Sequence, residues 1–236
     1  MASFLLLRLR AVREGLTGSD IVNTPFIGAV AVLFGLFVTF GASDVVQRSR
    51  ELNLAAQKET NTARALLRLT ESIGPTADPV RQSLIEYLQA ATTTELDWLA
   101  ARGEGEPPAR AQADTLVEAT TLFVTQAGGA ETVKSLIMNK VDDLRQARTQ
   151  RIELSHASSS VSQWLGLTVI AFLTQLAIAL THAGKPHGAA TALTLFTAAA
   201  ITAMAYLAWA DGLLGPSKVL SAVTPLRELL ELLARG

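Results

Sequence analysis

The stretch PFIGAVAVLFGLFVTFGA, residues 25–42, contains no charged side chain. Two further stretches of similar length, residues 161–180 and 188–210, also lack charges. About 20 consecutive apolar residues span the hydrocarbon core of a bilayer as a helix, and a helix pairs nearly all of its backbone polar groups within one segment. The sequence therefore predicts an all-α membrane protein with three transmembrane helices, at residues 25–46, 161–182 and 188–210.

The segments around these helices follow from their composition. They are an amphipathic N-terminal arm, a helical domain in water and an amphipathic C-terminal tail, at residues 1–24, 47–160 and 211–236. In the arm the apolar run Phe4–Leu7 precedes Arg8, Arg10 and Arg13, which is the reverse of the order in a signal peptide. We expect the arm to lie on the membrane surface. The helix predicted from Pro225 in the tail either lies on the membrane or caps the helical domain.

Lysine and arginine close to the membrane indicate the topology, because they are enriched on the cytoplasmic side. The smaller group, on one side of the predicted membrane, is Arg8, Arg10, Arg13 and Lys185. The larger group, on the other side, is Arg48, Arg50, Lys58, Arg145, Arg148, Arg151, Lys218 and Arg227. We therefore expect the helical domain and the C-terminus in the cytoplasm and the N-terminus outside.

The first membrane helix meets no glycine or proline stop between Ala42 and Gly74-Pro75. We therefore predict one long helix that leaves the membrane and continues into water. Its extension carries an apolar seam with steps of three and four residues, the spacing of one helix face. The seam consists of Leu52, Ala56, Glu59, Ala63, Leu66, Thr70 and Ile73.

Three further helices are predicted in the water-facing domain. The first has Asp78 as its N-cap and Pro79 at its first position. The second runs from Ala109 to Gln126, after a loop rich in glycine and proline at residues 102–108. The third starts near Glu131 and runs toward the second membrane helix. The domain is thus predicted to consist of long extensions of the membrane helices, with shorter helices packed on them.

Glu59 is an acidic residue within an otherwise apolar seam, so it needs a partner or water. Arg145, Arg148 and Arg151 lie on the helix that returns to the membrane. We predict that the outgoing and returning helices pack antiparallel, with Glu59 facing this row of arginines in structural ion pairs.

A column of apolar side chains on the first membrane helix is a candidate pore lining. Val30, Phe34, Phe37 and Gly41 are close to one helix face, and a hydrophobic constriction of this kind can gate a channel by dewetting. Phenylalanines that face lipid or pack against a neighbouring helix are the commoner explanation.

Three polar residues in or beside the membrane helices have two interpretations each. Gln175 lies midway along the second membrane helix and either lines a pore or forms an interhelical hydrogen bond. Asp44 and Asp211 either rim a pore or pair with Arg48 and Lys218 as interfacial charges. The pore interpretation makes Asp44 and Gln175 candidate pore-lining residues.

Other chemistry finds little support in the sequence. The chain has no cysteine, a formal net charge of −1, no glycine-rich phosphate loop and no basic patch with aromatic residues of the kind that binds nucleic acid. The histidines do not form a helical pair with four-residue spacing; they are His156, His182 and His187. We therefore predict no catalytic residue, no metal site, no cofactor and no nucleic-acid partner, and we do not expect an enzyme.

Between Ile27 and Leu230 the chain resembles the bacterial bestrophin-like membrane domain family. The resemblance rests on the order and spacing of several segments. These are Ala42–Arg48, Glu59 followed by Ala63, Leu66, Leu67 and Arg68, then Tyr87, Glu95–Trp98, Asp143–Arg148, Trp164, Asp211 and Pro225-Leu226.

The resemblance implies kinship with bestrophins, which are homopentameric anion channels with a hydrophobic neck and a helical cytosolic part. It implies a homo-oligomeric ion channel, anion-selective, in a bacterial inner membrane, with the lipid bilayer and inorganic ions as partners. The alternative is a non-conducting membrane-anchored sensor or scaffold whose cytoplasmic domain binds a protein. Many relatives carry one more N-terminal hydrophobic span, in place of which this chain has the arm at Ser3–Arg13. It also lacks the acidic cluster with which bestrophins bind calcium, which argues against calcium gating.

Overall fold

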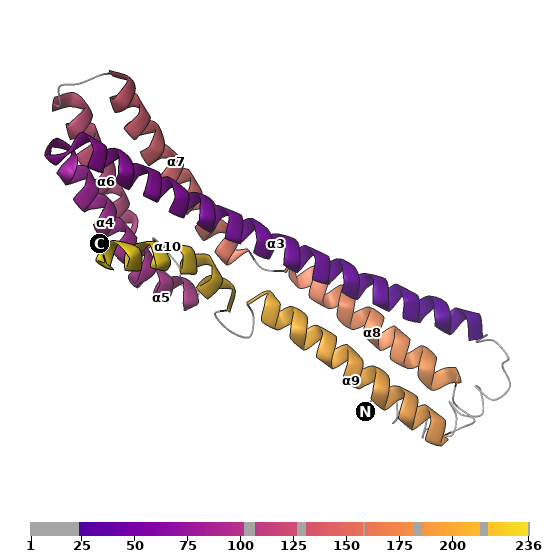
Figure 1. The fold of residues 1–236 in the computed structure, drawn as a ribbon. Coiled ribbons are helices and arrows are strands. Elements are labelled where there is room, and N and C mark those ends of the chain that lie inside the picture. The colour runs from indigo at the N-terminus through magenta and orange to yellow at the C-terminus, as the bar shows by residue number, and fades with distance from the viewer. Residues whose placement is uncertain are drawn as a thin grey trace. The chain divides into compact units, whose positions relative to one another are not determined.

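The structure is a computed structural model, and it describes residues 24–101, 107–126, 131–157, 159–181, 186–212 and 217–235. Within these ranges every regular element is a helix and no strand occurs, so the predicted all-α class is confirmed (Figure 1). The elements are α3 (Thr24–Ile73), the 3-10 helix η1 (Pro75–Ala77), α4 (Asp78–Thr92), α5 (Thr94–Ala100), α6 (Arg110–Gln126), α7 (Glu131–His156), α8 (Val161–Thr181), α9 (Pro186–Ala210) and α10 (Ser217–Arg235). The predicted N-terminal arm up to residue 23, most of the loop at 102–108 and the turn at 182–185 lie outside the described residues.

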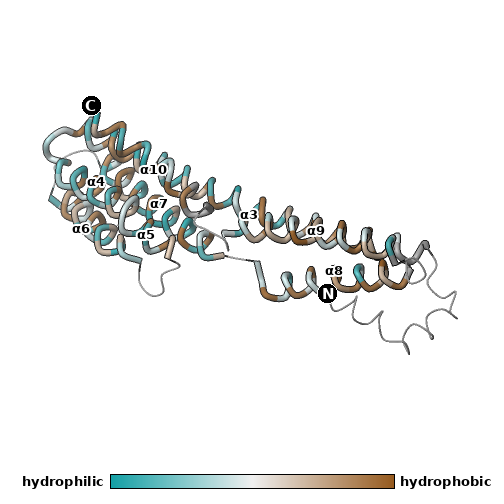
Figure 2. Tube along the Cα trace, turned by 90° about the horizontal axis from the view of Figure 1, so that it is seen from below, coloured by the Kyte–Doolittle hydropathy of each residue, from teal (hydrophilic) through white to brown (hydrophobic). Residues whose placement is uncertain are grey.

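The chain divides into two compact units. Unit 1 consists of Met1–Val46 and Ser159–Asp211, and unit 2 of Gln47–Ser158 and Gly212–Gly236. Helix α3 therefore contributes its first part to unit 1 and its second part to unit 2. Apolar residues predominate along α8 and α9 of unit 1, while the helices of unit 2 alternate between polar and apolar residues (Figure 2).

Among the residues that the structure describes, three helices are long and apolar enough to cross a membrane, which confirms the predicted number. They lie within Gly28–Ile73, Glu131–Leu180 and His187–Ala210. Their threonine hydroxyls donate to the carbonyl oxygen four residues earlier, for example Thr174 to Ile170 at 2.8 Å and Thr202 to Ala198 at 2.8 Å. A hydroxyl that is bonded within its own helix can face hydrocarbon at little cost, so these threonines are compatible with a membrane span.

Helix α3 is continuous from Thr24 to Ile73, as predicted. It ends at Gly74, whose φ of 86° lies in the left-handed region that glycine adopts without strain. The return path differs, because α7 ends at His156 and α8 begins only at Val161. The outgoing helix is therefore unbroken along the sequence, whereas the returning one is interrupted between His156 and Val161.

The prediction that Asp78 caps α4 is wrong. The turn η1 brings Asp78 to φ −56° and ψ −38°, which are already helical angles, so it is the first residue of the helix and makes no capping bond from its side chain. Its carboxylate instead approaches Arg81, one turn further on, at 3.4 Å. Pro79 is nevertheless in the first turn, where its missing N–H costs nothing.

The predicted seam of α3 forms one wall of the core of unit 2. Its members from Leu52 to Thr70 are buried. The core contains Ala63, Leu66 and Leu67 of α3 with Val80, Leu84, Tyr87, Leu88 and Ala91 of α4, Ala113 and Leu116 of α6, and Ile137, Val141 and Leu144 of α7. Leu226 and Leu229 of α10 complete it, so α10 packs on the bundle. Helix α10 begins at Ser217, earlier than predicted, and includes Pro225.

Candidate functional site

The candidate pore-lining residues on the part of α3 that belongs to unit 1 do not all face the same way. The ring of Phe34 packs edge-on against Phe196 of α9, with 5.0 Å between the ring centroids. A Cβ atom on Gly41 would lie 3.8 Å from Leu167 of α8 and 3.8 Å from Leu207 of α9. Phe34 and Gly41 therefore face the helices of their own chain.

Phe37 lies on a different side of α3. Its side chain is 45% exposed, and Phe40 beyond it is 67% exposed. Residues three apart differ by about 60° around a helix, which turns Phe37 away from the direction of Phe34 and turns Phe40 further. Val30 is half-buried. The column predicted as one face thus has a packed part and an outward-facing part.

Gln175 joins two membrane helices. Its Nε2 donates to Oγ1 of Thr197 on α9 at 3.2 Å, and this hydroxyl donates in turn to the carbonyl of Leu193 at 2.6 Å. This geometry corresponds to the interhelical hydrogen bond, one of the two roles considered for Gln175. An amide that is bonded in this way between two membrane helices stabilises the pair by about 0.6–2 kcal/mol.

The two aspartates at the end of unit 1 both accept hydrogen bonds. Asp44 accepts from Nε2 of Gln163 at 2.9 Å, and Asp211 accepts from the backbone N–H of Ser159 at 2.7 Å. Asp211 is only 4% exposed. Both carboxylates are therefore engaged with the segment that opens α8.

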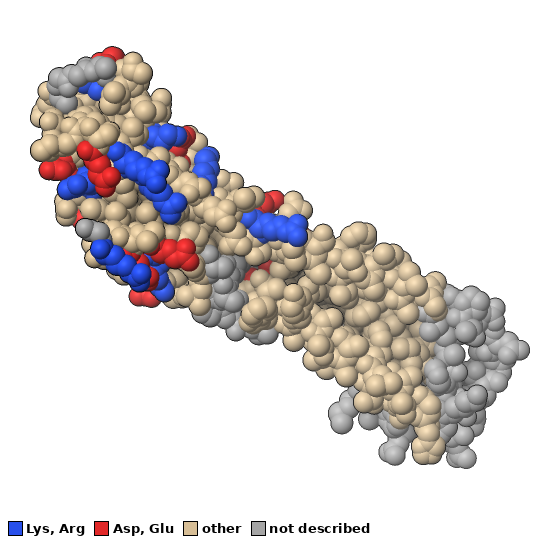
Figure 3. Space-filling view, viewed as in Figure 1, with Lys and Arg blue, Asp and Glu red and all other residues tan. Residues whose placement is uncertain are grey.

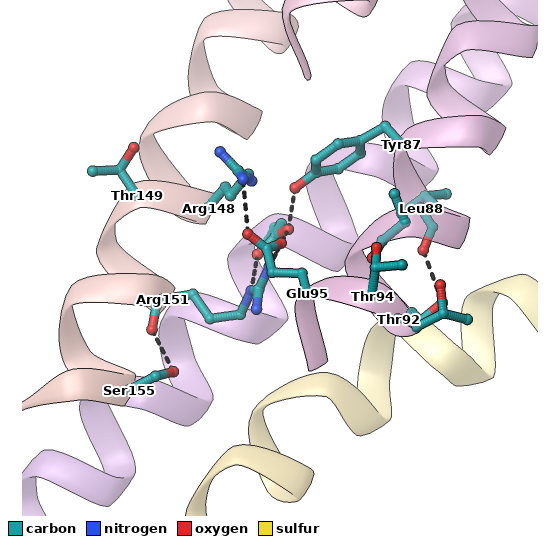
Figure 4. A network of polar contacts seen from close by, with 12 residues as sticks. Tyr87, Leu88, Thr92, Thr94, Glu95, Arg148, Thr149, Arg151 and Ser155 are labelled. Carbon is teal, nitrogen blue, oxygen red and sulfur yellow. Dashed lines mark hydrogen bonds and ion pairs between the residues drawn. The ribbon is translucent and has the colours of Figure 1, made fainter. Parts of the chain in front are cut away.

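A cluster of buried charged side chains lies in unit 2, where α3, α4, α5 and α7 meet. Arg151 donates from Nε to Oε2 of Glu59 at 2.6 Å and from Nη2 to Oε2 of Glu95 at 3.0 Å. Arg148 donates from Nη2 to Oε1 of Glu95 at 2.7 Å. The hydroxyl of Tyr87 donates to Oε1 of Glu59. Figure 4 shows Arg148 and Arg151 on α7, and Tyr87 approaching from α4.

Burial and charge act together on this cluster. Glu59, Glu95 and Arg151 are fully buried, and a buried charge needs an opposite partner. Burial would lower the pKa of Arg151, but Glu59 and Glu95 outweigh it and raise the pKa, which keeps the guanidinium charged. Burial, followed by the negative charge of Glu59, raises the pKa of Tyr87 well above its ordinary value, so the phenol remains a donor.

The three arginines predicted opposite Glu59 have different positions. Arg151 contacts Glu59, Arg148 contacts Glu95, and Arg145 is exposed. Each step of three residues turns the direction of the side chain by about 60°. Arg148 is therefore displaced to the neighbouring carboxylate and Arg145 turns toward solvent, so the expectation of one row facing Glu59 is corrected.

Comparison of the sequence with known protein families identifies the family of this chain. The sequence profile of the bestrophin-like domain matches residues 1–213. The chain belongs to the bestrophin-like family. No curated protein sequence matches it. The resemblance inferred from Glu59, Tyr87 and the segment Glu95–Trp98 is therefore confirmed at the level of the family.

Solved structures share the bestrophin-like fold. A variant of the bacterial bestrophin homologue from Klebsiella pneumoniae is 14% identical, with a TM-score of 0.72, and the match covers 97% of this chain and 94% of that one. A second variant of the same homologue is 15% identical, with a TM-score of 0.73 and coverage of 98% and 95%. At this identity the likeness shows the fold.

Sequence reasoning missed Glu95 and Tyr87 as partners in the network of this bestrophin-like chain. A signal was present, because Glu95 follows Leu88 by seven residues and precedes Leu99 by four, which puts it on the same apolar face. An acidic residue on an apolar helix face indicates a buried partner, as it did for Glu59. In the described part of the chain, no group of three or more histidine and acidic side chains could hold a metal ion.

Proposed function

We propose that the protein is a homo-oligomeric, anion-selective channel in which the outward-facing side of α3 lines a central pore. Characterised bestrophin-like proteins are ion channels. The observation that carries the assignment to α3 is the exposed stripe along this helix. The proposed oligomer is a pentamer by analogy with bestrophins, in a bacterial inner membrane, with residues 47–160 in the cytoplasm.

One copy of the chain cannot enclose the pore. The described side chains between the membrane helices of unit 1 pack against one another, as Phe34 does with Phe196 and Gln175 with Thr197. A conducting pathway in water therefore requires several copies around an axis, and the surface that lines it must be exposed in the single chain.

Helix α3 has exposed side chains about every two turns along one face. Leu33, Phe40, Gln47, Leu54 and Asn61 follow one another at seven-residue spacing, which keeps side chains close to one helix face, and each is exposed. The stripe is apolar where the helix is in unit 1 and mainly polar in unit 2. An apolar constriction followed by a polar passage is a typical order for a gated ion pathway.

The charge on the second part of α3 supports anions as the permeant ions. The exposed basic side chains there are Arg50, Lys58 and Arg68, against Glu71 as the exposed acidic one. Figure 3 shows lysine and arginine interspersed with aspartate and glutamate on the helices of unit 2, and a surface without charge along the membrane helices of unit 1 in the same view. Repeated around an axis, an excess of positive charge raises the local anion concentration.

Flux into liposomes tests this function. Purified protein is reconstituted, its stoichiometry is measured, and chloride flux is compared with potassium flux for the wild type, Phe37→Ala and the matched variant Phe172→Ala. Phe172 is an exposed phenylalanine on α8. Selective chloride flux that changes in Phe37→Ala, but not in Phe172→Ala, is the expected result. A strictly monomeric protein, or no flux from an inserted oligomer, would contradict the proposal and favour the scaffold.

A further inference from the structure

Three covalent connections join unit 1 to unit 2, and polar side chains gather beside all of them. The chain crosses after Val46, before Ser159 and after Asp211. Asp44 lies two residues from the first crossing, while Ser159 and Asp211 are themselves at the other two. Any mechanical signal carried by the backbone between the units must pass these points.

The start of α8 is fixed by a reciprocal pair of hydrogen bonds. The N–H of Gln163 donates to Oγ of Ser160 at 3.3 Å, and the N–H of Ser160 donates to Oε1 of Gln163 at 3.2 Å. This is the capping box that a serine forms with a glutamine three residues later. It gives the N–H of Ser160 a partner, and it adds a second acceptor for the N–H of Gln163, which also donates to the carbonyl of Ser160 at 3.0 Å.

Gln163 uses its second polar atom to reach another helix. Its Nε2 donates to Oδ2 of Asp44 on α3 at 2.9 Å, while its Oε1 serves the cap. A side-chain amide carries an acceptor oxygen and a separate donor nitrogen at the same terminus. A glutamate here would preserve the cap but place a carboxylate against Asp44. The residue type therefore matches the two tasks together.

Asp211 makes the corresponding connection at the end of α9. Its carboxylate accepts the N–H of Ser159 at 2.7 Å. Helix α9 stops directly afterwards, because Gly212 has a φ of 80°, in the left-handed region that favours glycine. The end of α9 is thus fixed to the beginning of the segment that enters α8.

We propose that Gln163 and Asp211 are positioning residues that hold the three crossing points together. Gln163 fixes α3 to the start of α8 through Asp44, and Asp211 fixes the end of α9 to the same start. We call the contacts Gln163–Asp44 and Asp211–Ser159 the boundary clamp. The clamp sets where α3 leaves unit 1. This inference rests on the proposed function, because release of the clamp alters conduction only if α3 lines a pore. The clamp is a property of one chain, so it can be tested separately from conduction.

The test exchanges the two side chains of the bridge. In Gln163→Glu the cap is kept and the bridge becomes a repulsion, whereas in Gln163→Glu combined with Asp44→Asn an amide again faces a carboxylate. Because the chain has no cysteine, spin labels at Ala42→Cys and Leu165→Cys report the distance between α3 and α8. Thermal unfolding of each variant checks that it folds.

In Gln163→Glu, we expect the ratio of molecules with the wild-type label distance to molecules with other distances to fall about tenfold, which is the effect of losing one charge-assisted hydrogen bond. The double variant should restore this ratio. Chloride flux should fall and recover in parallel. Asp44→Leu removes the bridge without repulsion and should also broaden the distances, while Asp44→Asn should not. Unchanged distances in Gln163→Glu and Asp44→Leu, or no recovery in the double variant, would overturn the clamp. Altered distances without any flux, even in the wild type, would keep the clamp and refute the channel.

Discussion

Arg151 donates from Nε to Oε2 of Glu59 at 2.6 Å, and both side chains are fully buried in unit 2. The same guanidinium reaches Glu95 from Nη2 at 3.0 Å. One side chain of α7 therefore connects α3 with α5 in a place that water does not reach. When one member of such a pair is removed, the other charge remains buried without compensation.

Replacing Arg151 should destabilise the bundle strongly. Arg151→Met retains the apolar stem and leaves Glu59 with the hydroxyl of Tyr87 but without its positively charged partner. We expect a loss of about 3–5 kcal/mol in the free energy of unfolding, measured by denaturant titration in mild detergent. The exposed Arg145 on the same helix provides the control, because Arg145→Met should change stability by about 0.5 kcal/mol or less. Equal effects of the two substitutions would show that the buried pair does not stabilise the fold.

Tyr87→Phe should give a stability difference that depends on alkaline pH. At neutral pH we expect the variant to be about 1.5–3 kcal/mol less stable, because Glu59 loses a donor to its charged carboxylate. The pKa of Tyr87 is raised above its ordinary value of 10.0 on folding. Its stabilisation is therefore complete below pH 10.0 and is lost as the pH rises toward the folded-state pKa. Unfolding of both proteins between pH 7 and pH 11 should show the difference shrinking only above about pH 10.

Gly41 should accept alanine but not leucine. A Cβ atom there would meet Leu167 and Leu207 at 3.8 Å each, which is ordinary contact, so Gly41→Ala should be near neutral. Gly41→Leu should cost about 1–3 kcal/mol, because a larger side chain forces the helices apart. Gly166→Leu is the control, since an added Cβ meets nothing within 4 Å there. Thermal unfolding of the solubilised protein measures all three, and a tolerated Gly41→Leu would contradict the close packing.

Gln175→Leu separates the two roles considered for this residue. The hydrogen bond to Thr197 predicts a loss of about 0.6–2 kcal/mol in stability and unchanged ion selectivity. Reversal potentials in chloride and potassium gradients, measured beside thermal unfolding, check both parts. A shift in selectivity without loss of stability would place Gln175 in the pathway of the ions.

The seam of α3 was predictable, because an acidic residue among apolar ones at helical spacing needs a buried partner, and Glu59 has one. The identity of the partner was not, since Arg145, Arg148 and Arg151 differ in direction by about 60° per step and only packing decides which one faces inward. The same limit applies to Phe34 and Phe37, whose directions follow from where α8 and α9 lie. Asp78 was misassigned because η1 brings the chain into helical geometry one residue earlier than the proline signal indicates.

The central claim, that the outward-facing side of α3 lines a conducting pore, is tested most directly by chemical modification of single cysteines. The chain has none of its own, so Phe40→Cys on α3 and Phe172→Cys on α8 each introduce one reactive site into the reconstituted channel. A positively charged, water-soluble thiol reagent is applied while chloride current is recorded. We predict that modification changes the current through Phe40→Cys and leaves that through Phe172→Cys unaltered. A current that is insensitive at Phe40→Cys, with labelling verified by mass, would contradict the account.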